Sequence, residues 1–501
     1  MTATPTGGSG EGSLAAPTRH ALDWRNPSFY DEAALTKELE RIFDICHGCR
    51  RCFSLCNAFP TLFDAIDATA TGELASVDKK VFWEVVDHCY LCDMCFMTKC
   101  PYVPPHPWNV DFPHLMLRAK ANRVQREGVG LRDRVLASTE AVGKLAGIPV
   151  VAEVVNAVNR SRPGRALLAA TLGVHPDAPI PTYYSRSARK RLKGRVAAEP
   201  GLSGATSRAQ TSVPNEASGA PNEASGAPSG ASAAPSGASA APPEVPAPPL
   251  ASTRGRVALF TTCYGNRNEP QLLEDLVAIF EHNGIEVRLT AHERCCGMPW
   301  LELGDLQSVA QLKEENIPEL KRLRDAGFDI VAPVPSCVLM FKQELPLMFP
   351  EDTDVQAVRA RMFDPFEYLM LRHKAGLLRT DFKHALGKVS YHVPCHLRVQ
   401  NIGLKTRDLL RLAPQTTVEV IERCSGHDGT YGVKRRFRAA SERIGKPVAQ
   451  RVANAKADHY CSDCPMAGEQ IESLLAPDGA PASTQRHAEH PVRLLRFAYG
   501  I

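Results

Sequence analysis

Eight cysteines in the first hundred residues fall into two runs whose spacing suits iron chemistry. The first run, C-x2-C-x2-C-x3-C, comprises Cys46, Cys49, Cys52 and Cys56. The second run, C-x2-C-x2-C-x4-C, comprises Cys89, Cys92, Cys95 and Cys100. Three thiolates spaced in this way line one tight turn and can bind three irons of a cubane, while the fourth lies past the turn. The two runs therefore predict two 4Fe–4S clusters.

This arrangement resembles that of the two-cluster bacterial ferredoxins, apart from one extra residue before Cys100 in the second run. In those ferredoxins the fourth cysteine of each run binds the cluster of the other run. The first cluster is therefore assigned to Cys46, Cys49, Cys52 and Cys100. The second cluster is assigned to Cys89, Cys92, Cys95 and Cys56. A pair of zinc sites is the alternative, since four thiolates also satisfy zinc, but zinc sites usually pair two C-x2-C knuckles across a longer gap.

The other eight of the 16 cysteines lie in the second half of the chain and form a repeat. One half carries Cys263, Cys295, Cys296 and Cys337; the other carries Cys395, Cys424, Cys461 and Cys464. A shared E-R-C-x-G pentapeptide, at residues 293–297 and 422–426, sets the register of this duplication. In that register Val334 stands opposite Cys461, and Ser425 stands opposite Cys296. Each half keeps four thiolates, enough for one iron–sulfur cluster or one zinc ion.

Residues 257–501 resemble the pair of cysteine-rich (CCG) domains in the B subunit of heterodisulfide reductase. The stretches that carry this resemblance include CCGMP at 295–299, VPSC at 334–337 and HVPCHLR at 392–398. With the ferredoxin-like cysteines ahead of it, the layout resembles the iron–sulfur C subunit of anaerobic glycerol-3-phosphate dehydrogenase. The iron–sulfur subunit of glycolate oxidase has the same layout.

The resemblance implies an iron–sulfur subunit that passes electrons between a flavoprotein dehydrogenase, similar to glycerol-3-phosphate dehydrogenase, and a quinone or another acceptor. It implies a flavoprotein partner, a quinone or membrane subunit as a further partner, and one more cluster, or zinc, in one or both CCG domains. A thiol or disulfide reductase of the heterodisulfide type is an alternative, although its non-cubane cluster needs five cysteines and neither half has five. A non-catalytic scaffold that binds zinc or clusters is another.

Two histidines adjoin the second set of cysteines and could take part in the chemistry. His396 and His427 could hydrogen-bond a cluster or transfer a proton, although each could equally be a solvated or backbone-bonded residue. The chain has no P-loop and no glycine-rich turn after a strand, so we expect it to bind neither flavin nor NAD nor another nucleotide. The net charge of +4, without a base-reading element, argues against nucleic acid.

Composition and periodicity divide the chain into six segments. They are a disordered N-terminus (1–25), a ferredoxin-like domain (26–120), a helical extension with a basic flank (121–198), a disordered Ala/Pro/Ser/Gly linker (199–253), and two CCG domains (254–387 and 388–501). Strand patterns at 257–262, 285–289, 330–334 and 388–392 alternate with helical ones, which predicts an α+β unit followed by α/β domains with parallel or mixed sheets. The linker is long enough that the lobes must either dock directly or be bridged by a partner.

The sequence also predicts where the protein works. The N-terminus has no secretory signal pattern, and no stretch has about 18 uninterrupted apolar residues, so we expect a cytoplasmic protein. The basic residues between 186 and 195 could dock on an anionic membrane at its inner face, or they could be an unstructured flank of the linker.

Overall fold

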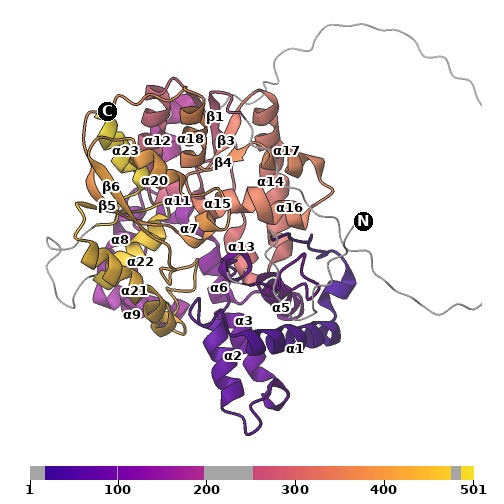
Figure 1. Cartoon of the computed structure of the whole chain (residues 1–501). Coiled ribbons are helices and arrows are strands. Elements are labelled where there is room, and N and C mark those ends of the chain that lie inside the picture. The colour runs from indigo at the N-terminus through magenta and orange to yellow at the C-terminus, as the bar shows by residue number, and fades with distance from the viewer. Residues whose placement is uncertain (1–16, 99, 197–251, 476–486) are drawn as a thin grey trace, which may run out of the picture.

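Figure 1 shows the protein as a computed structural model, which describes residues 17–98, 100–196, 252–475 and 487–501. Most of the predicted linker (199–251) and residues 1–16 of the predicted N-terminal segment lie outside the described residues. Three parts follow one another in the rest: a helical unit with the first eight cysteines, a helical extension, and two α/β domains.

The first unit is built from helices whose ends carry the cysteines. Its elements are η1 (Pro27–Tyr30), α1 (Glu32–Cys49), α2 (Ala58–Asp67), η2 (Leu74–Ser76), α3 (Lys80–His88), α4 (Met94–Thr98) and α5 (Phe112–Glu127). Helix α1 begins where the Asp31 side chain accepts a hydrogen bond from the backbone of Ala34 at 2.6 Å. It ends at Arg50 in the left-handed conformation, so the chain turns sharply just after Cys49.

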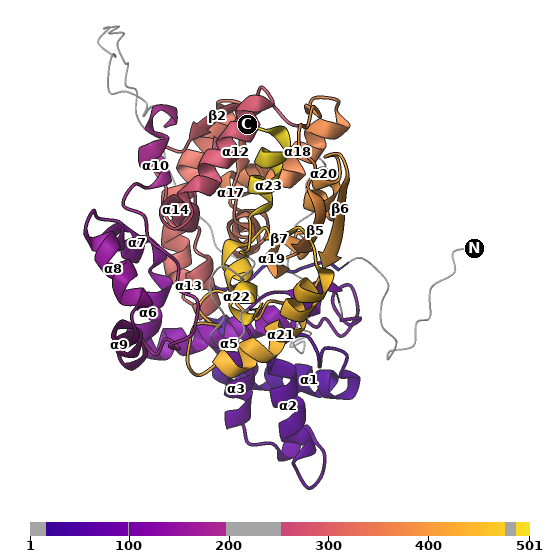
Figure 2. The same ribbon diagram turned by 90° about the vertical axis from the view of Figure 1, so that its left-hand side faces the viewer.

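The extension consists of short helices gathered at one side of the molecule (Figure 2). They are α6 (Leu131–Ala137), α7 (Thr139–Ala146), α8 (Val151–Arg160), α9 (Arg162–Leu172), α10 (Ala188–Arg191) and η3 (Lys193–Arg195). The predicted helical pattern is thus realised as several helices separated by tight turns. None of the described helices alone is long and apolar enough to cross a membrane.

The basic stretch at 186–195 packs on the first CCG domain. Arg191 pairs with Glu274 at 3.0 Å, and Arg195 pairs with Glu281. Arg189 donates to the carbonyl oxygen of Ala291 at 2.8 Å. The prediction of an unstructured flank is therefore wrong for the described part of this stretch, because ion pairs and backbone contacts hold it in place.

The first CCG domain has a four-stranded parallel sheet in the order β2-β1-β3-β4. The strands are β1 (Arg256–Leu259), β2 (Glu286–Leu289), β3 (Asp329–Val331) and β4 (Met362–Phe363). The helices are α11 (Cys263–Arg267), α12 (Pro270–His282), α13 (Met298–Leu303), α14 (Leu306–Asp325), α15 (Pro335–Leu339), η4 (Met340–Glu344), α16 (Leu345–Met348), α17 (Thr353–Arg359) and α18 (Pro365–Lys374).

The second CCG domain repeats this plan with a three-stranded parallel sheet in the order β6-β5-β7. The strands are β5 (Gly387–His392), β6 (Thr416–Ile421) and β7 (His459–Ser462). The helices are α19 (Cys395–Arg398), α20 (Lys405–Leu410), α21 (Arg438–Ala455), α22 (Pro465–Leu475) and α23 (Pro491–Tyr499). The predicted strand–helix alternation and parallel sheets are confirmed.

Strand pairing corrects the predicted register of the last part of the repeat, which comprises β3 and α15 in the first CCG domain and β7 and α22 in the second. Asp329 at the start of β3 pairs with Val257, and His459 at the start of β7 pairs with Val389. The helix after each strand begins with a proline six residues further on, because α15 starts at residue 335 and α22 at residue 465. Cys464, just before the second proline, therefore corresponds to residue 334 in the first domain.

The same register also changes the partners of Cys461 and Cys337. Cys461 lies within β7 and corresponds to Val331 within β3, rather than to Val334. Ala467 corresponds to Cys337. The predicted match was shifted by three residues, because it aligned two C-x-x-C-like stretches by their last cysteine rather than by the helix start.

The first unit and the CCG domains dock directly, one of the two arrangements that the linker length left open. One hydrophobic core contains Phe43 of α1, Phe112 of α5 and Met298 of α13. Residues 17–25, assigned from the sequence to the disordered N-terminus, join this interface. The Trp24 indole donates to the carbonyl oxygen of Met348 at 3.0 Å, so burial of an aromatic residue anchors this segment.

Candidate metal centres

The structure gathers the first group of cysteines at the end of α1. Cys100 comes from the end of the second run and lies beside Cys46, Cys49 and Cys52. Burial, more than the three neighbouring thiols, raises the pKa of Cys46 well above its usual value. These four cysteines, each only partly exposed, line one small cavity together with mostly apolar side chains.

The second group comprises Cys56, Cys89, Cys92 and Cys95, so the fourth cysteine of the first run crosses to the second run. Burial raises the pKa of Cys95, and Cys52, Cys89 and Cys56 lie close enough that the charge of these thiolates raises it further. Burial raises the pKa of Cys89 to about 11. The structure thus brings together the two sets that the predicted exchange of fourth ligands requires, and the two sets adjoin each other.

The third group lies at the carboxyl ends of parallel strands of the first CCG domain. Cys263 starts α11 after β1, and Cys337 lies in α15 after β3. Cys295 and Cys296 follow β2. Cys295 hydrogen-bonds both Cys263 and Cys296, and Cys296 in turn hydrogen-bonds Cys337. A hydrogen bond with Cys295, then burial, raises the pKa of Cys263 well above its usual value. All four cysteines predicted for this site come together.

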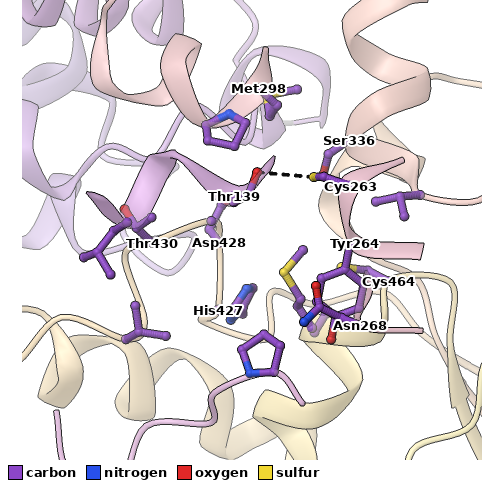
Figure 3. Close-up of a pocket in the computed structure, with 18 of the residues that line it drawn as sticks. Thr139, Cys263, Tyr264, Asn268, Met298, Ser336, His427, Asp428, Thr430 and Cys464 are labelled. Carbon is purple, nitrogen blue, oxygen red and sulfur yellow. Dashed lines mark hydrogen bonds between the residues drawn. The ribbon is translucent and has the colours of Figure 1, made fainter. Parts of the chain in front are cut away.

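The extension supplies a polar partner for this third group. The Thr139 hydroxyl, at the start of α7, donates to the Cys263 sulfur at 3.3 Å (Figure 3). The Glu140 carboxylate accepts from the backbone of Cys295 at 3.1 Å. No sequence signal points to either residue, because both sit in a helical stretch far from any cysteine.

The second CCG domain brings together only part of its predicted set. Cys395 and Cys424 hydrogen-bond each other, and Cys395 also hydrogen-bonds Cys92 of the second group. The Tyr90 hydroxyl lies 3.3 Å from the Cys424 sulfur. This pair of thiols therefore faces the first unit of the protein.

The remaining two cysteines of the second CCG domain lie apart from this pair. Cys464 lines the same cavity as the pair, and burial raises its pKa to about 12. Cys461 is fully buried in the core of the sheet, beside Tyr391 on β5, and does not line the cavity. The structure does not bring Cys461 to the site, because a strand residue with its side chain in the core cannot also face the strand ends.

One cavity of about 370 Å³ joins the two CCG domains. Seven cysteines line it: Cys263, Cys295, Cys296, Cys337, Cys395, Cys424 and Cys464. The opposite wall is aliphatic and comes from the extension, including Val142 of α7 and Val155 of α8. The extension therefore covers the cysteines.

Both predicted histidines face this cavity. His396 places its Nδ1 2.7 Å from the Ser336 hydroxyl, which links the two CCG domains. Neither ring nitrogen of His427 has a hydrogen-bond partner among the described residues. Burial lowers the pKa of both rings to about 4, so they are neutral at pH 7. Their role in tuning or proton transfer stays a prediction.

The donor set suits iron–sulfur clusters. The groups consist of buried or partly buried thiols, and ligation to iron supplies the positive charge that thiolates need in such surroundings. In the described ranges, no three His, Cys, Asp or Glu side chains are arranged around one point as a single metal ion requires.

Comparison with known proteins bears on the two α/β domains. Residues 257–342 and 389–471 match the cysteine-rich (CCG) domain. The C subunit of anaerobic glycerol-3-phosphate dehydrogenase from Escherichia coli (strain K12) is 29% identical over 253 residues, which cover 50% of this chain and 60% of the relative. The B subunit of fumarate reductase (CoM/CoB) from Methanothermobacter marburgensis is 27% identical over 229 residues, 45% of this chain and 43% of the relative.

An uncharacterized iron-sulfur protein of Methanococcus maripaludis is 26% identical over 224 residues, 44% of this chain and 42% of the relative. The chain thus spans between about two fifths and three fifths of the length of these relatives. It carries two CCG cysteine-rich domains and is a homologue, at modest identity, of oxidoreductase subunits and of iron–sulfur proteins.

Proposed function

We propose that the chain is an iron–sulfur electron-transfer subunit that passes electrons between a flavoprotein dehydrogenase and a quinone or another acceptor. The observation that carries this proposal is the contact between the second cysteine group and the second CCG domain. There the Cys92 thiol hydrogen-bonds Cys395, and Tyr90 reaches Cys424. When bound, 4Fe–4S clusters supply one-electron redox chemistry.

The contacts between groups suggest an order for the relay. The first and second groups approach each other through Cys52 and Cys95. The second group reaches the second CCG domain through Cys92. From there the hydrogen bond between His396 and Ser336 leads to the first CCG domain. Electrons would enter at one end of this row and leave at the other.

We assign two 4Fe–4S clusters to the first two groups and one further cluster to the first CCG domain. The second CCG domain contributes contact residues to the relay, since only three of its cysteines line the cavity. The relatives' names support a dehydrogenase of the glycerol-3-phosphate type as partner. Cysteines at close, fixed spacing support a cytoplasmic location, where they stay reduced.

A thiol or disulfide reductase is a second candidate, because seven cysteines line one cavity. One experiment separates the two. The anaerobically reconstituted chain is reduced with dithionite and then mixed with menadione or with oxidised glutathione. Electron transfer to a quinone predicts rapid return of the cluster absorption with menadione alone. Rapid reoxidation by the disulfide alone would favour the second candidate, and reoxidation by neither would contradict both.

A further inference from the structure

The extension carries a patch of exposed aliphatic side chains on its outer surface. We call it the aliphatic patch, and it comprises Leu145, Ile148, Val150, Val151, Val154 and Val158. Each of these side chains is between 37% and 73% exposed. Six of the thirteen most exposed large hydrophobic side chains in the described chain thus fall within residues 145–158. Such clustering marks an interaction surface, whereas single exposed apolar residues are ordinary.

The local geometry turns these side chains outward. Helices α7 and α8 meet at an angle of 110°. In the turn between them Val150 has a φ of +72°, an unusual conformation for a β-branched residue. On α8, residues Val151, Val154 and Val158 are spaced so that they share one face. The result is an apolar turn followed by an apolar helix face.

Charge around the aliphatic patch is basic. From residue 144 to residue 162 the chain has three basic residues, Lys144, Arg160 and Arg162, and one acidic residue, Glu153. Lys144 precedes the patch and pairs with Glu140 at 2.5 Å, whereas both arginines follow the patch and are exposed. The two exposed arginines at the end of this apolar segment favour an anionic surface, where their long side chains can reach the charged groups.

The composition of the patch fits lipid better than a protein partner. Protein interfaces concentrate their binding energy in Trp, Tyr and Arg within shaped pockets, and the patch has only Leu, Ile and Val. A bilayer requires no matching shape. Helices α7 and α8 together, but neither of them alone, have the length and apolar composition of a membrane span, and their sharp bend suits a segment that lies in the interface.

We propose that the aliphatic patch docks the protein on the surface of an anionic lipid bilayer, with Val150 and Val154 inserted among the lipids. In the basic stretch at 186–195, the membrane site expected from the sequence, Arg189, Arg191 and Arg195 instead pair with carboxylates of the first CCG domain. Val155 faces inward and lines the cysteine cavity. Since a helix is about 10 Å across, docking brings the bilayer close to that cavity.

The test uses the full chain, purified anaerobically with its clusters, and needs no electron donor or acceptor. Vesicles of phosphatidylethanolamine and phosphatidylglycerol are floated through a density gradient with the wild type and with the double variant Val150→Asp/Val154→Asp. The wild type is expected to float, and the double variant to bind at least about tenfold more weakly, because two exposed aliphatic side chains that insert among the lipids become charged. Leu377→Asp is the matched control and is expected to bind like the wild type, since Leu377 is 53% exposed and lies outside the extension.

Three outcomes would overturn the proposal. The first is a wild type that stays at the bottom of the gradient, and the second is a double variant that floats equally well. The third is a wild-type dimer, detected by light scattering without lipid, that the double variant converts to monomers, because the patch would then join two copies. Circular dichroism of both variants excludes loss of the fold as the cause.

Discussion

The two CCG domains share the order of three parallel strands, to which the first domain adds β4, and yet they present different groups at the ends of these strands. In the first domain, four thiols lie in series from Cys263 to Cys337. In the second, Cys395 and Cys424 form a pair, Cys464 lies apart, and Cys461 is buried in the sheet. A duplicated fold repeats positions, but the residues at two of them, Ser425 and Ala467, remove thiols from the second copy.

Each site is completed by a hydroxyl from outside its own domain. The Thr139 hydroxyl of the extension hydrogen-bonds the Cys263 sulfur of the first site. The Tyr90 hydroxyl of the N-terminal unit hydrogen-bonds the Cys424 sulfur of the second. The first site faces the extension and the second faces the other cysteine groups. The comparison suggests that one copy kept a cluster site while the other became a contact to the rest of the relay.

The largest expected difference lies in the effect of removing one cysteine from each domain. Cys337→Ser should abolish the cluster of the first CCG domain, because the site has four thiols and needs them all. Cys461→Ser should leave the iron content unchanged, because its side chain lies in the core of β7. Iron analysis and EPR of both variants check this, and equal iron loss from the two would contradict the comparison.

Acid should open the second CCG domain before the first. Burial lowers the pKa of His392, His427 and His490 to about 4, against an unfolded value of about 6.5. Below that unfolded value the unfolded chain binds protons that the folded domain excludes. Stability is therefore fully present above pH 6.5 and is lost as the pH falls toward 4, by up to about 3 kcal/mol per histidine.

Hydrogen exchange detected by mass spectrometry can compare the central strands of the two domains at neutral pH and at about pH 5. Faster exchange at the lower pH is expected in β5 and not in β1, where Phe260 occupies the position of His392. Exchange rates should be corrected for the intrinsic effect of pH. A first domain that opens as readily as the second would break this part of the comparison.

The two hydroxyls should differ in their effect on redox potential. Thr139→Val removes a donor to the Cys263 sulfur, so the reduced state loses stabilisation and the potential should fall by tens of millivolts, on the order of one hydrogen bond. Tyr90→Phe should leave the potential of this same centre unchanged, because Tyr90 contacts Cys424 instead. A potentiometric titration followed by EPR measures both. A rise in potential for Thr139→Val would contradict the assignment.

The smallest effect is expected from shortening the linker. Both of its described ends lie on the first CCG domain, since Val196 bridges Leu289 and the carbonyl oxygen of Ser252 accepts from Arg361 at 3.1 Å. Deleting residues 217–241 should leave cluster content and electron transfer unchanged. Loss of electron transfer with intact clusters would show that the linker acts as more than a tether.

Cysteine spacing and strand patterns predicted much of the fold and most of the grouping of thiols. Ligand spacing is local, and parallel strands place the residues after them at one edge, so the set from Cys263 to Cys337 could be expected. The ferredoxin-like fold of the first unit stays a prediction. Cys461 was misplaced, because the number of residues between strand and helix start cannot be read from cysteine spacing.

The contacts between distant segments of the chain could not be predicted from the sequence either. Nothing in a helical pattern shows that Thr139 faces Cys263, or that Arg191 faces Glu274. These contacts join segments separated by the linker, and packing rather than local preference decides them.

The central claim is that this chain is an iron–sulfur protein with three clusters, one of them in the first CCG domain alone. Analysis of iron, sulfide and zinc in anaerobically reconstituted full-length protein tests it most directly. The account predicts about twelve irons and about twelve sulfides per chain, which corresponds to three 4Fe–4S clusters, with no stoichiometric zinc. About eight irons per chain or fewer, or zinc in place of iron, would contradict it.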